Sequence, residues 1–98
     1  MIDLAPVELD IVRNLLARHV PGCEVRVFGS RVNGSTKPYS DLDLVIVGEE
    51  RIDSQQLSEL REAFVESDLP FRVDLLDWTQ ISAEFRAVIE KEFEIIQS

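Results

Sequence analysis

Segments with the two-residue repeat of a β-strand alternate along this 98-residue chain with segments that have the spacing of a helix. Strand-like runs rich in apolar residues lie at 24–28, 42–47 and 71–76. Between them, apolar residues recur at three- and four-residue intervals, as the buried stripe of a helix requires. These stripes comprise Ile11, Val12, Leu15 and Leu16, then Leu57, Leu60 and Phe64, and finally Ile81, Phe85, Val88 and Ile89. The alternation predicts an α/β (α+β) fold, with a small sheet flanked by helices.

Turn and capping residues mark where these elements end. Pro6 stands where the first turn of a helix tolerates proline, and Pro21-Gly22 ends the helix that follows. Asp53 and Gln56, three positions apart, resemble a capping box and predict the start of the second helix. Residues 93–96 are expected to form a short strand after the last helix. The order of the strands in the sheet does not follow from these patterns.

The segment after the first strand contains a turn suited to phosphate binding. Gly29 and Ser30 directly follow the strand-like run that ends at Phe28. Glycine lets the backbone approach a phosphate without a clash from Cβ. Ser30 would supply a hydroxyl group and, if a helical turn starts there, a backbone N–H at its positive end. This turn is therefore a candidate for binding a polyphosphate.

Three aspartates provide a candidate metal site near this turn. Asp41 and Asp43 flank Leu42, so on a strand they would point to one face about 6.5 Å apart. Two such carboxylates repel each other, which raises the pKa of one unless cations intervene. Mg²⁺ is usually held by one or two carboxylates together with substrate phosphates. Asp74, in the third strand-like run, would add a third carboxylate and suit a site with two metal ions.

The combination resembles the signature of the nucleotidyltransferases of the DNA polymerase beta superfamily, in which Gly-Ser is followed after ten residues by Asp-x-Asp. Residues 27–31, Val-Phe-Gly-Ser-Arg, and residues 40–44, Ser-Asp-Leu-Asp-Leu, resemble in particular the minimal nucleotidyltransferases, the MNT or MntA-like antitoxins. The resemblance runs from Val25 to the last helix. It implies a nucleotidyltransferase core with a mixed sheet, in which the strand of the Asp-x-Asp pair lies beside the strand of Asp74.

The resemblance also implies roles for individual residues. Asp41 and Asp43 would bind Mg²⁺, and Asp74 would be the third ligand, near the incoming hydroxyl group. Gly29 and Ser30 would grip the triphosphate of ATP.

One position departs from the family pattern. Arg31 is the best candidate for a cationic contact to the nucleotide, with a surface arginine after a turn as the alternative. Many relatives carry a second arginine where this chain has Asn33, which leaves the preferred base and the strength of nucleotide binding open.

Composition limits the partners and the compartment. With 45% hydrophobic residues, 98 residues suffice for one core but not two, so residues 1–98 are expected to form a single domain. The net charge of −9 argues against nucleic-acid binding, which depends on cationic contacts to phosphates. No apolar run has the roughly 20 residues of a membrane helix, and the N-terminal segment does not look like a signal peptide. A single cysteine, Cys23, fits a core position in a reducing cytoplasm.

The function implied by the resemblance is Mg²⁺-dependent transfer of AMP from ATP to a tyrosine hydroxyl of a HEPN-type ribonuclease toxin, with this chain as the antitoxin. The alternative from another class is a catalytically weak module that neutralises its partner toxin by contact, which Asn33 keeps open. A third option is transfer to a small molecule such as an aminoglycoside. Longer relatives cover their substrate with a second helical domain, so for this option a homodimer would have to supply the missing wall.

Overall fold

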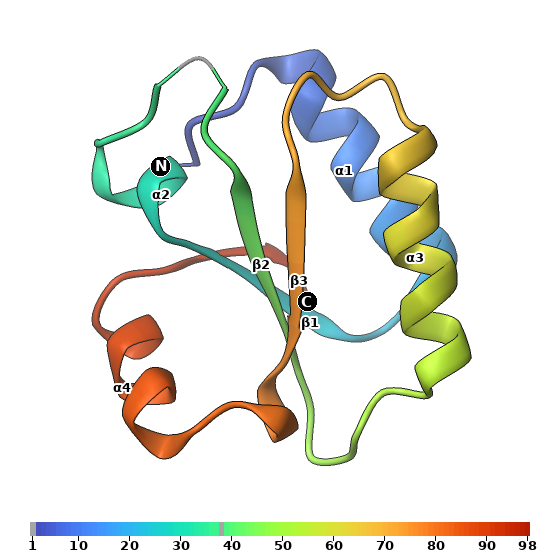
Figure 1. Cartoon of the computed structure of the whole chain (residues 1–98), viewed down its shortest axis with the longest axis vertical. Coiled ribbons are helices and arrows are strands. Elements are labelled where there is room, and N and C mark those ends of the chain that lie inside the picture. Colours follow the sequence, from blue (N-terminus) through green and yellow to red (C-terminus); the bar gives the residue numbers. More distant parts are fainter. Residues whose placement is uncertain (1, 38) are drawn as a thin grey trace.

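The computed structural model describes residues 2–37 and 39–98 (Figure 1). Helices and strands alternate along the chain, as the sequence pattern predicts. In chain order the elements are α1 (Pro6–His19), β1 (Glu24–Phe28), α2 (Ser30–Asn33), β2 (Leu42–Val47), α3 (Ser54–Glu66), β3 (Val73–Asp77), the 3-10 helix η1 (Trp78–Gln80), α4 (Ala83–Lys91) and β4 (Glu94–Gln97).

The strands form one mixed sheet in the order β3-β2-β1-β4. β1 pairs antiparallel with β2 and with β4, whereas β2 and β3 run parallel. The expectation of a mixed sheet flanked by helices is therefore confirmed, including the placement of the Asp43 strand beside the Asp74 strand. β3 and β4 form the two edges of the sheet.

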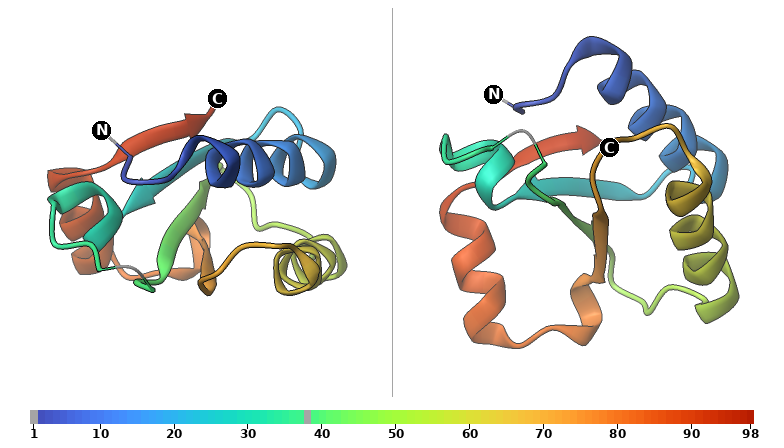
Figure 2. Two further views of the ribbon diagram at one scale, coloured as in Figure 1. Left: turned by 90° about the horizontal axis from the view of Figure 1, so that it is seen from above. Right: turned by 45° about the horizontal axis from the view of Figure 1, so that its top comes forward.

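One face of the sheet carries the main core. Alternate residues of β1 and β2 point to this face and are almost fully buried, as are the apolar residues of α1 and α3 that cover it. Figures 1 and 2 show both helices on this side of the sheet. The innermost members are Val12, Leu16, Val25, Val27, Leu42, Leu44, Ile46 and Leu60. Leu42, Leu44 and Ile46 thus face away from Asp43, as the two-residue period of a strand requires.

The opposite face is only partly covered. α4 lies on this side (Figure 1), where the rings of Phe28 and Phe85 meet edge to face with centroids 5.8 Å apart. Val45 is fully buried at the middle of this face, while Asp43, two residues earlier on β2, is only half-buried. The end of the face that carries Asp43 is thus the open end.

Several predicted boundaries differ from those observed. The third strand begins at Val73 and not at Phe71, because residues 67–72 form the irregular connection from α3. α4 begins at Ala83, and Ile81 lies before it, because Asp77 and Ser82 start two separate helical turns. Val88 was expected in the buried stripe, but 57% of it is exposed. Within the described residues, no helix has the length and apolar character needed to cross a membrane.

Asp77 links β3 to two neighbouring segments. Its carboxylate accepts hydrogen bonds from the Ile52 N–H at 2.9 Å and from the N–H and hydroxyl of Thr79 at 2.9 and 2.8 Å. Burial acts to raise the pKa of Asp77, but these hydrogen bonds and the charge of Arg51 outweigh it and lower the pKa below its usual value of 3.8. Asp77 therefore caps η1, the turn that precedes α4.

We expect Asp77→Ala to lower the free energy of unfolding by about 2 kcal/mol at pH 7, because it leaves the partly buried donors of Ile52 and Thr79 without an acceptor. The folded-state pKa lies below the unfolded one, so this stabilisation is present above pH 3.8 and disappears as the pH falls further. Asp53→Ala is the matched control, since it removes one exposed cap bond, to Gln56, and should cost about 1 kcal/mol. Urea denaturation at several pH values tests this, and equal losses for the two variants would contradict it.

Candidate active site

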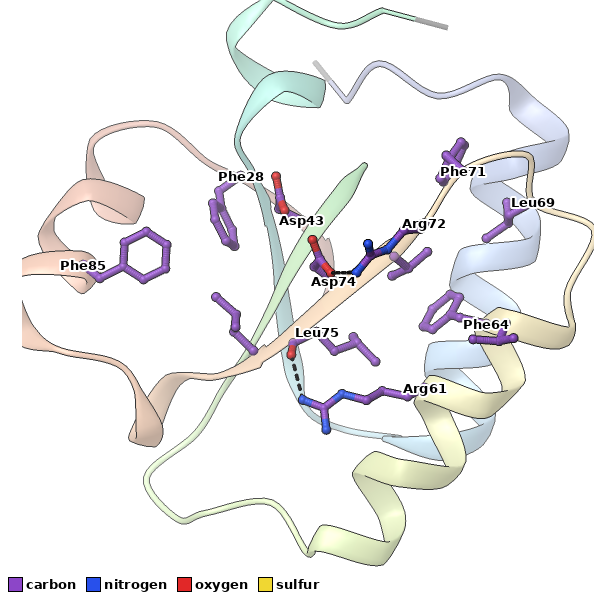
Figure 3. A pocket seen from close by; sticks show the side chains of 13 residues that line it. Phe28, Asp43, Arg61, Phe64, Leu69, Phe71, Arg72, Asp74, Leu75 and Phe85 are labelled. Carbon is purple, nitrogen blue, oxygen red and sulfur yellow. Dashed lines mark hydrogen bonds and ion pairs between the residues drawn. The ribbon is translucent and has the colours of Figure 1, made fainter. Parts of the chain in front are cut away.

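The register between β2 and β3 brings two of the predicted aspartates together. Asp43 and Asp74 are direct partners in this parallel pair, so their side chains point to the same face of the sheet. Figure 3 shows both carboxylates directed into one pocket. Asp41 lies one residue before the start of β2 and is half-buried. This register accounts for Asp43 and Asp74, whereas Asp41 lies outside the paired residues and does not line the pocket, although its charge acts on Asp43.

The electrostatics of Asp43 reflect this crowding. The pKa of Asp43 is raised from 3.8 to about 6, first by burial of its carboxyl group and then by the negative charges of Asp74 and Asp41. A cation bound among these groups would relieve both the repulsion and the unfavourable burial of charge.

Gly29 packs directly against Asp43. Its φ of 79° and ψ of −152° lie in a region of backbone space that is essentially restricted to glycine. A Cβ atom added at Gly29 would lie 2.4 Å from Oδ2 of Asp43, which is far inside contact distance. The turn therefore approaches the carboxylate as closely as a backbone can.

Ser30 is the first residue of α2, a single helical turn. The Gly29 carbonyl accepts hydrogen bonds from the N–H groups of Val32 and Asn33, so the N–H groups of Ser30 and Arg31 lie at the start of the turn, ahead of this pattern. The side chain of Ser30 is half-buried, and its carbonyl accepts a 2.6 Å hydrogen bond from the Thr36 hydroxyl. The condition under which Ser30 would offer a backbone N–H, a helical turn that starts there, is thus met.

Arg31 does not extend towards the carboxylates. Only 5% of it is exposed, and its guanidinium donates to the Ser40 carbonyl at 2.7 and 3.2 Å and to the Asp3 carbonyl at 3.1 Å. It also lies over the ring of Phe71 at 4.3 Å. This geometry contradicts the alternative of a surface arginine, whereas the contact between Arg31 and the nucleotide stays a prediction. Arg31 fixes the loop that leads into Asp41 and ties it to the N-terminal segment.

A pocket of about 900 Å³ opens around the carboxylates and the edge of β3 (Figure 3). Asp43 and Asp74 lie in it between Phe28 and Phe85 on the α4 side and Phe71 and other apolar residues on the α3 side. Sequence reasoning did not assign the aromatic residues to the site. For Phe28 a signal was available, because its alternation with the core residue Val27 places it on the face of Asp43.

Arg72 is a further residue that sequence reasoning did not assign to the site. Its Nη2 lies 3.6 Å from Oδ1 of Asp74, and its side chain is 81% exposed. An ion pair this open to solvent contributes little stability. Arg72 is free to exchange Asp74 for another partner and so leaves this carboxylate accessible.

The donor set suits Mg²⁺, which prefers carboxylate oxygens and usually keeps substrate phosphates or water among its ligands. In the described part of the chain, no group of three or more acidic, histidine or cysteine side chains is arranged to hold a metal ion unaided. Asp41 and Asp43 with a bound polyphosphate match the usual ligand set, and the raised pKa of Asp43 shows where positive charge would be favourable.

A mixed sheet with this turn and these carboxylates is the core of a nucleotidyltransferase. The chain belongs to the nucleotidyltransferase domain family, whose sequence model matches residues 9–96. It is 51% identical over 96 residues to the Probable protein adenylyltransferase MntA of Haemophilus influenzae, a match that covers 98% of this chain and 84% of that protein.

Solved structures share the fold. A chain of a toxin–antitoxin structure with AMP-PNP matches 92% of this chain with a TM-score of 0.75 and 22% identity, over 73% of its own length. A chain from the complex of a tri-AMPylated Shewanella oneidensis HEPN toxin with an MNT antitoxin matches 92% of this chain with a TM-score of 0.64 and 21% identity, over 72% of its length. At these identities the matches describe a common architecture.

We expect Gly29→Ala to lower the free energy of unfolding by about 2 kcal/mol or more and to displace Asp43, because the added Cβ meets both backbone strain and the carboxylate. Gly34→Ala is the matched control. Gly34 also has positive φ, 86°, but a Cβ there meets nothing within 4 Å, so the cost should be about 1 kcal/mol. Thermal denaturation and ATP binding measure the difference. Equal effects of both variants would show that the contact with Asp43 imposes no constraint.

We expect Asp43→Asn to raise the free energy of unfolding of the metal-free protein by on the order of 1 kcal/mol at pH 7.5, after allowance for solvent screening. The folded-state pKa, about 6, lies above the unfolded value of 3.8, so ionised Asp43 destabilises the fold fully above pH 6 and progressively less towards pH 3.8.

Denaturation curves at pH 7.5 and pH 5 would therefore show a smaller gain at the lower pH. Asp10→Asn, which removes an exposed charge on α1, should show no comparable change. A gain that does not depend on pH would contradict the assigned cause.

Proposed function

We propose that this protein is a protein adenylyltransferase that transfers AMP from ATP to a hydroxyl group of a partner protein. The single observation that carries the proposal is the placement of Asp43 opposite Asp74 on one open face of the sheet, with the Gly29 turn packed against Asp43. The identity of 51% with the Haemophilus influenzae protein supports protein, and not a small molecule, as the acceptor.

The reaction would proceed in line at the α-phosphorus. The acceptor oxygen forms a bond to this phosphorus while the bond to the bridging oxygen of the β-phosphate breaks, and pyrophosphate leaves with that electron pair. Asp74, on the strand beside Asp43, would orient the hydroxyl group and accept its proton. Gly29 and Ser30 would hold the triphosphate through the backbone and hydroxyl groups of the turn. This chain's contribution is mainly positioning.

Mg²⁺ would be held by Asp41 and Asp43 together with phosphate oxygens, with Asp74 as a further ligand. When bound, it supplies charge neutralisation at the transferring phosphoryl group. Ionised Asp43 is unfavourable in its crowded, half-buried position, which fits such a role because a bound cation would stabilise the ionised carboxylate.

The partner we infer is a HEPN-type ribonuclease toxin, modified on a tyrosine, with this chain as its antitoxin in the cytoplasm. A tri-AMPylated HEPN toxin occurs together with an MNT antitoxin in one of the solved structures of this fold. The net charge of −9 also favours a basic protein over nucleic acid as the partner.

The test is to incubate the protein with Mg²⁺, a HEPN-type partner from the same genome and ATP labelled at either the α- or the γ-phosphate. Label from the α-position alone should reach the partner, and peptide mass spectrometry should locate the added adenylyl mass on a tyrosine. Asp43→Ala should lower the rate on the order of a thousand-fold. Asp10→Asn, which removes a charge of the same sign outside the site, should leave the rate unchanged.

The same assay separates this function from neutralisation by contact, which the replacement of a family arginine by Asn33 favours. If the wild-type protein and an Asp41→Ala/Asp43→Ala variant silence the partner equally, and no label is transferred, the protein is a binding module.

A further inference from the structure

Among residues 2–37 and 39–98, no strand pairs with the outer edge of β3, which lies beside the proposed catalytic face. β3 ends the sheet on this side, and the Leu42 N–H of the segment that begins β2 donates to the Arg72 carbonyl at 2.9 Å. Backbone groups alternate in direction along a strand, so those of Arg72 and Asp74 face β2 while those of Val73 and Leu75 point outwards. An incoming strand would find these outward groups in a row.

The pocket described above forms a groove along this edge. Figure 3 shows β3 crossing it, with α4 and Phe85 on one side and α3 with Phe64 on the other. Val65 of α3 lines the pocket and is 84% exposed. The floor of the groove is β3, on which Val73 is half-buried and Leu75 almost fully buried, and its walls combine apolar side chains with the charged Arg61, Arg72, Asp43 and Asp74.

One of these outward-facing groups, the Leu75 carbonyl, already accepts a hydrogen bond from a side chain. Arg61, an exposed residue of α3, donates from Nη2 to the Leu75 carbonyl at 3.1 Å. Charged side chains over a sheet edge are a common way to prevent uncontrolled pairing with other chains. Because a backbone donor can displace an exposed arginine, Arg61 hinders strand pairing at this edge but does not prevent it.

We propose that an extended segment of the acceptor protein pairs with the outer edge of β3 and so places its hydroxyl-bearing residue beside Asp74. The inference rests on the proposed adenylyl transfer. In an antiparallel pair, the residue opposite Asp74 would form a non-hydrogen-bonded pair with it, with Cα atoms about 4.5 Å apart. Its side chain would then project onto the face shared by Asp43 and Asp74.

In this arrangement the nucleotide and the acceptor residue lie at different strands of the extended sheet. Asp43 on β2 serves the nucleotide, Asp74 on β3 lies between, and the acceptor residue occupies the added strand, with strands about 4.8 Å apart. Recognition through the backbone fixes the register of the acceptor, and the groove walls select its side chains.

Charge favours a foreign segment over a second copy of this chain. The charged residues that line the groove are Arg61, Arg72, Asp43 and Asp74, and the rest of α3 adds three glutamates outside it, Glu59, Glu62 and Glu66. With a net charge of −9, two copies repel each other, whereas a segment flanked by lysine or arginine is attracted. The occupant is therefore an extended segment with basic flanks.

Val73→Pro tests the pairing. Proline is tolerated at the first residue of an edge strand, and here it would remove only an outward-facing N–H while the bonds to β2 remain. Val73→Ala is the matched control, because it shortens the side chain and keeps the N–H. We expect Val73→Pro to reduce kcat/KM for the partner protein about tenfold relative to Val73→Ala, with unchanged affinity for ATP.

Two measurements keep the inference testable if Val73→Pro does not fold. Amide exchange followed by NMR should slow at Val73 and Leu75, and not at Asp74, when a peptide containing the modified residue is added. Arg61→Ala should lower KM for the partner and leave KM for ATP unchanged, because it frees the Leu75 carbonyl.

The outcomes separate this inference from the proposed function. If the wild-type protein transfers no AMP to any partner, the adenylyl transfer itself is wrong. If transfer occurs but Val73→Pro and Val73→Ala modify the partner equally well, or the amides of Val73 and Leu75 exchange unchanged with the peptide bound, pairing at the β3 edge is overturned.

Discussion

Asp43 and Asp74 share one face of the sheet because β2 and β3 pair in parallel with these residues directly opposite each other. A shift of one residue in this pairing would turn Asp74 towards the core and bring Leu75 to the open face. The core prevents that shift, since Leu44 and Leu75 are partners in the same ladder and both are buried between the sheet and the helices. The packing that stabilises the fold thus also sets the geometry of the site.

One face of the sheet packs the core that stabilises the fold, and the other face carries the proposed site. The α1 and α3 face is filled by fully buried aliphatic residues, whereas the other face leaves Asp43 half-buried among like charges with a raised pKa. Gly29 adds a strained backbone conformation that brings the turn against this carboxylate. Backbone strain at Gly29 and the raised pKa of Asp43 are both unfavourable to the fold. Their occurrence side by side is typical of a ligand-binding site.

Much of this arrangement could be predicted from the sequence, because local patterns determine it. The bounds of β1 and β2, the turn at Gly29 and the shared direction of Asp43 and Asp74 all follow from the two-residue period and from the family signature. Arg31 could not be predicted in the same way. Its carbonyl partners belong to Ser40 and Asp3, which are remote in sequence, and only the folded chain brings them together. The exposure of Val88 likewise depends on how α4 is placed on the sheet.

Arg31 and the β3 edge suggest how so small a core could control two substrates separately. The nucleotide side is rigid, since Arg31 fixes the loop before Asp41 through three hydrogen bonds and Gly29 leaves no space beside Asp43. The proposed acceptor side ends in the edge strand β3, where Arg61 covers the Leu75 carbonyl. If the acceptor pairs there, the wall that completes the site belongs to the substrate protein. Nucleotide binding then depends on this chain alone, and specificity for the acceptor depends on whether its backbone can extend along β3.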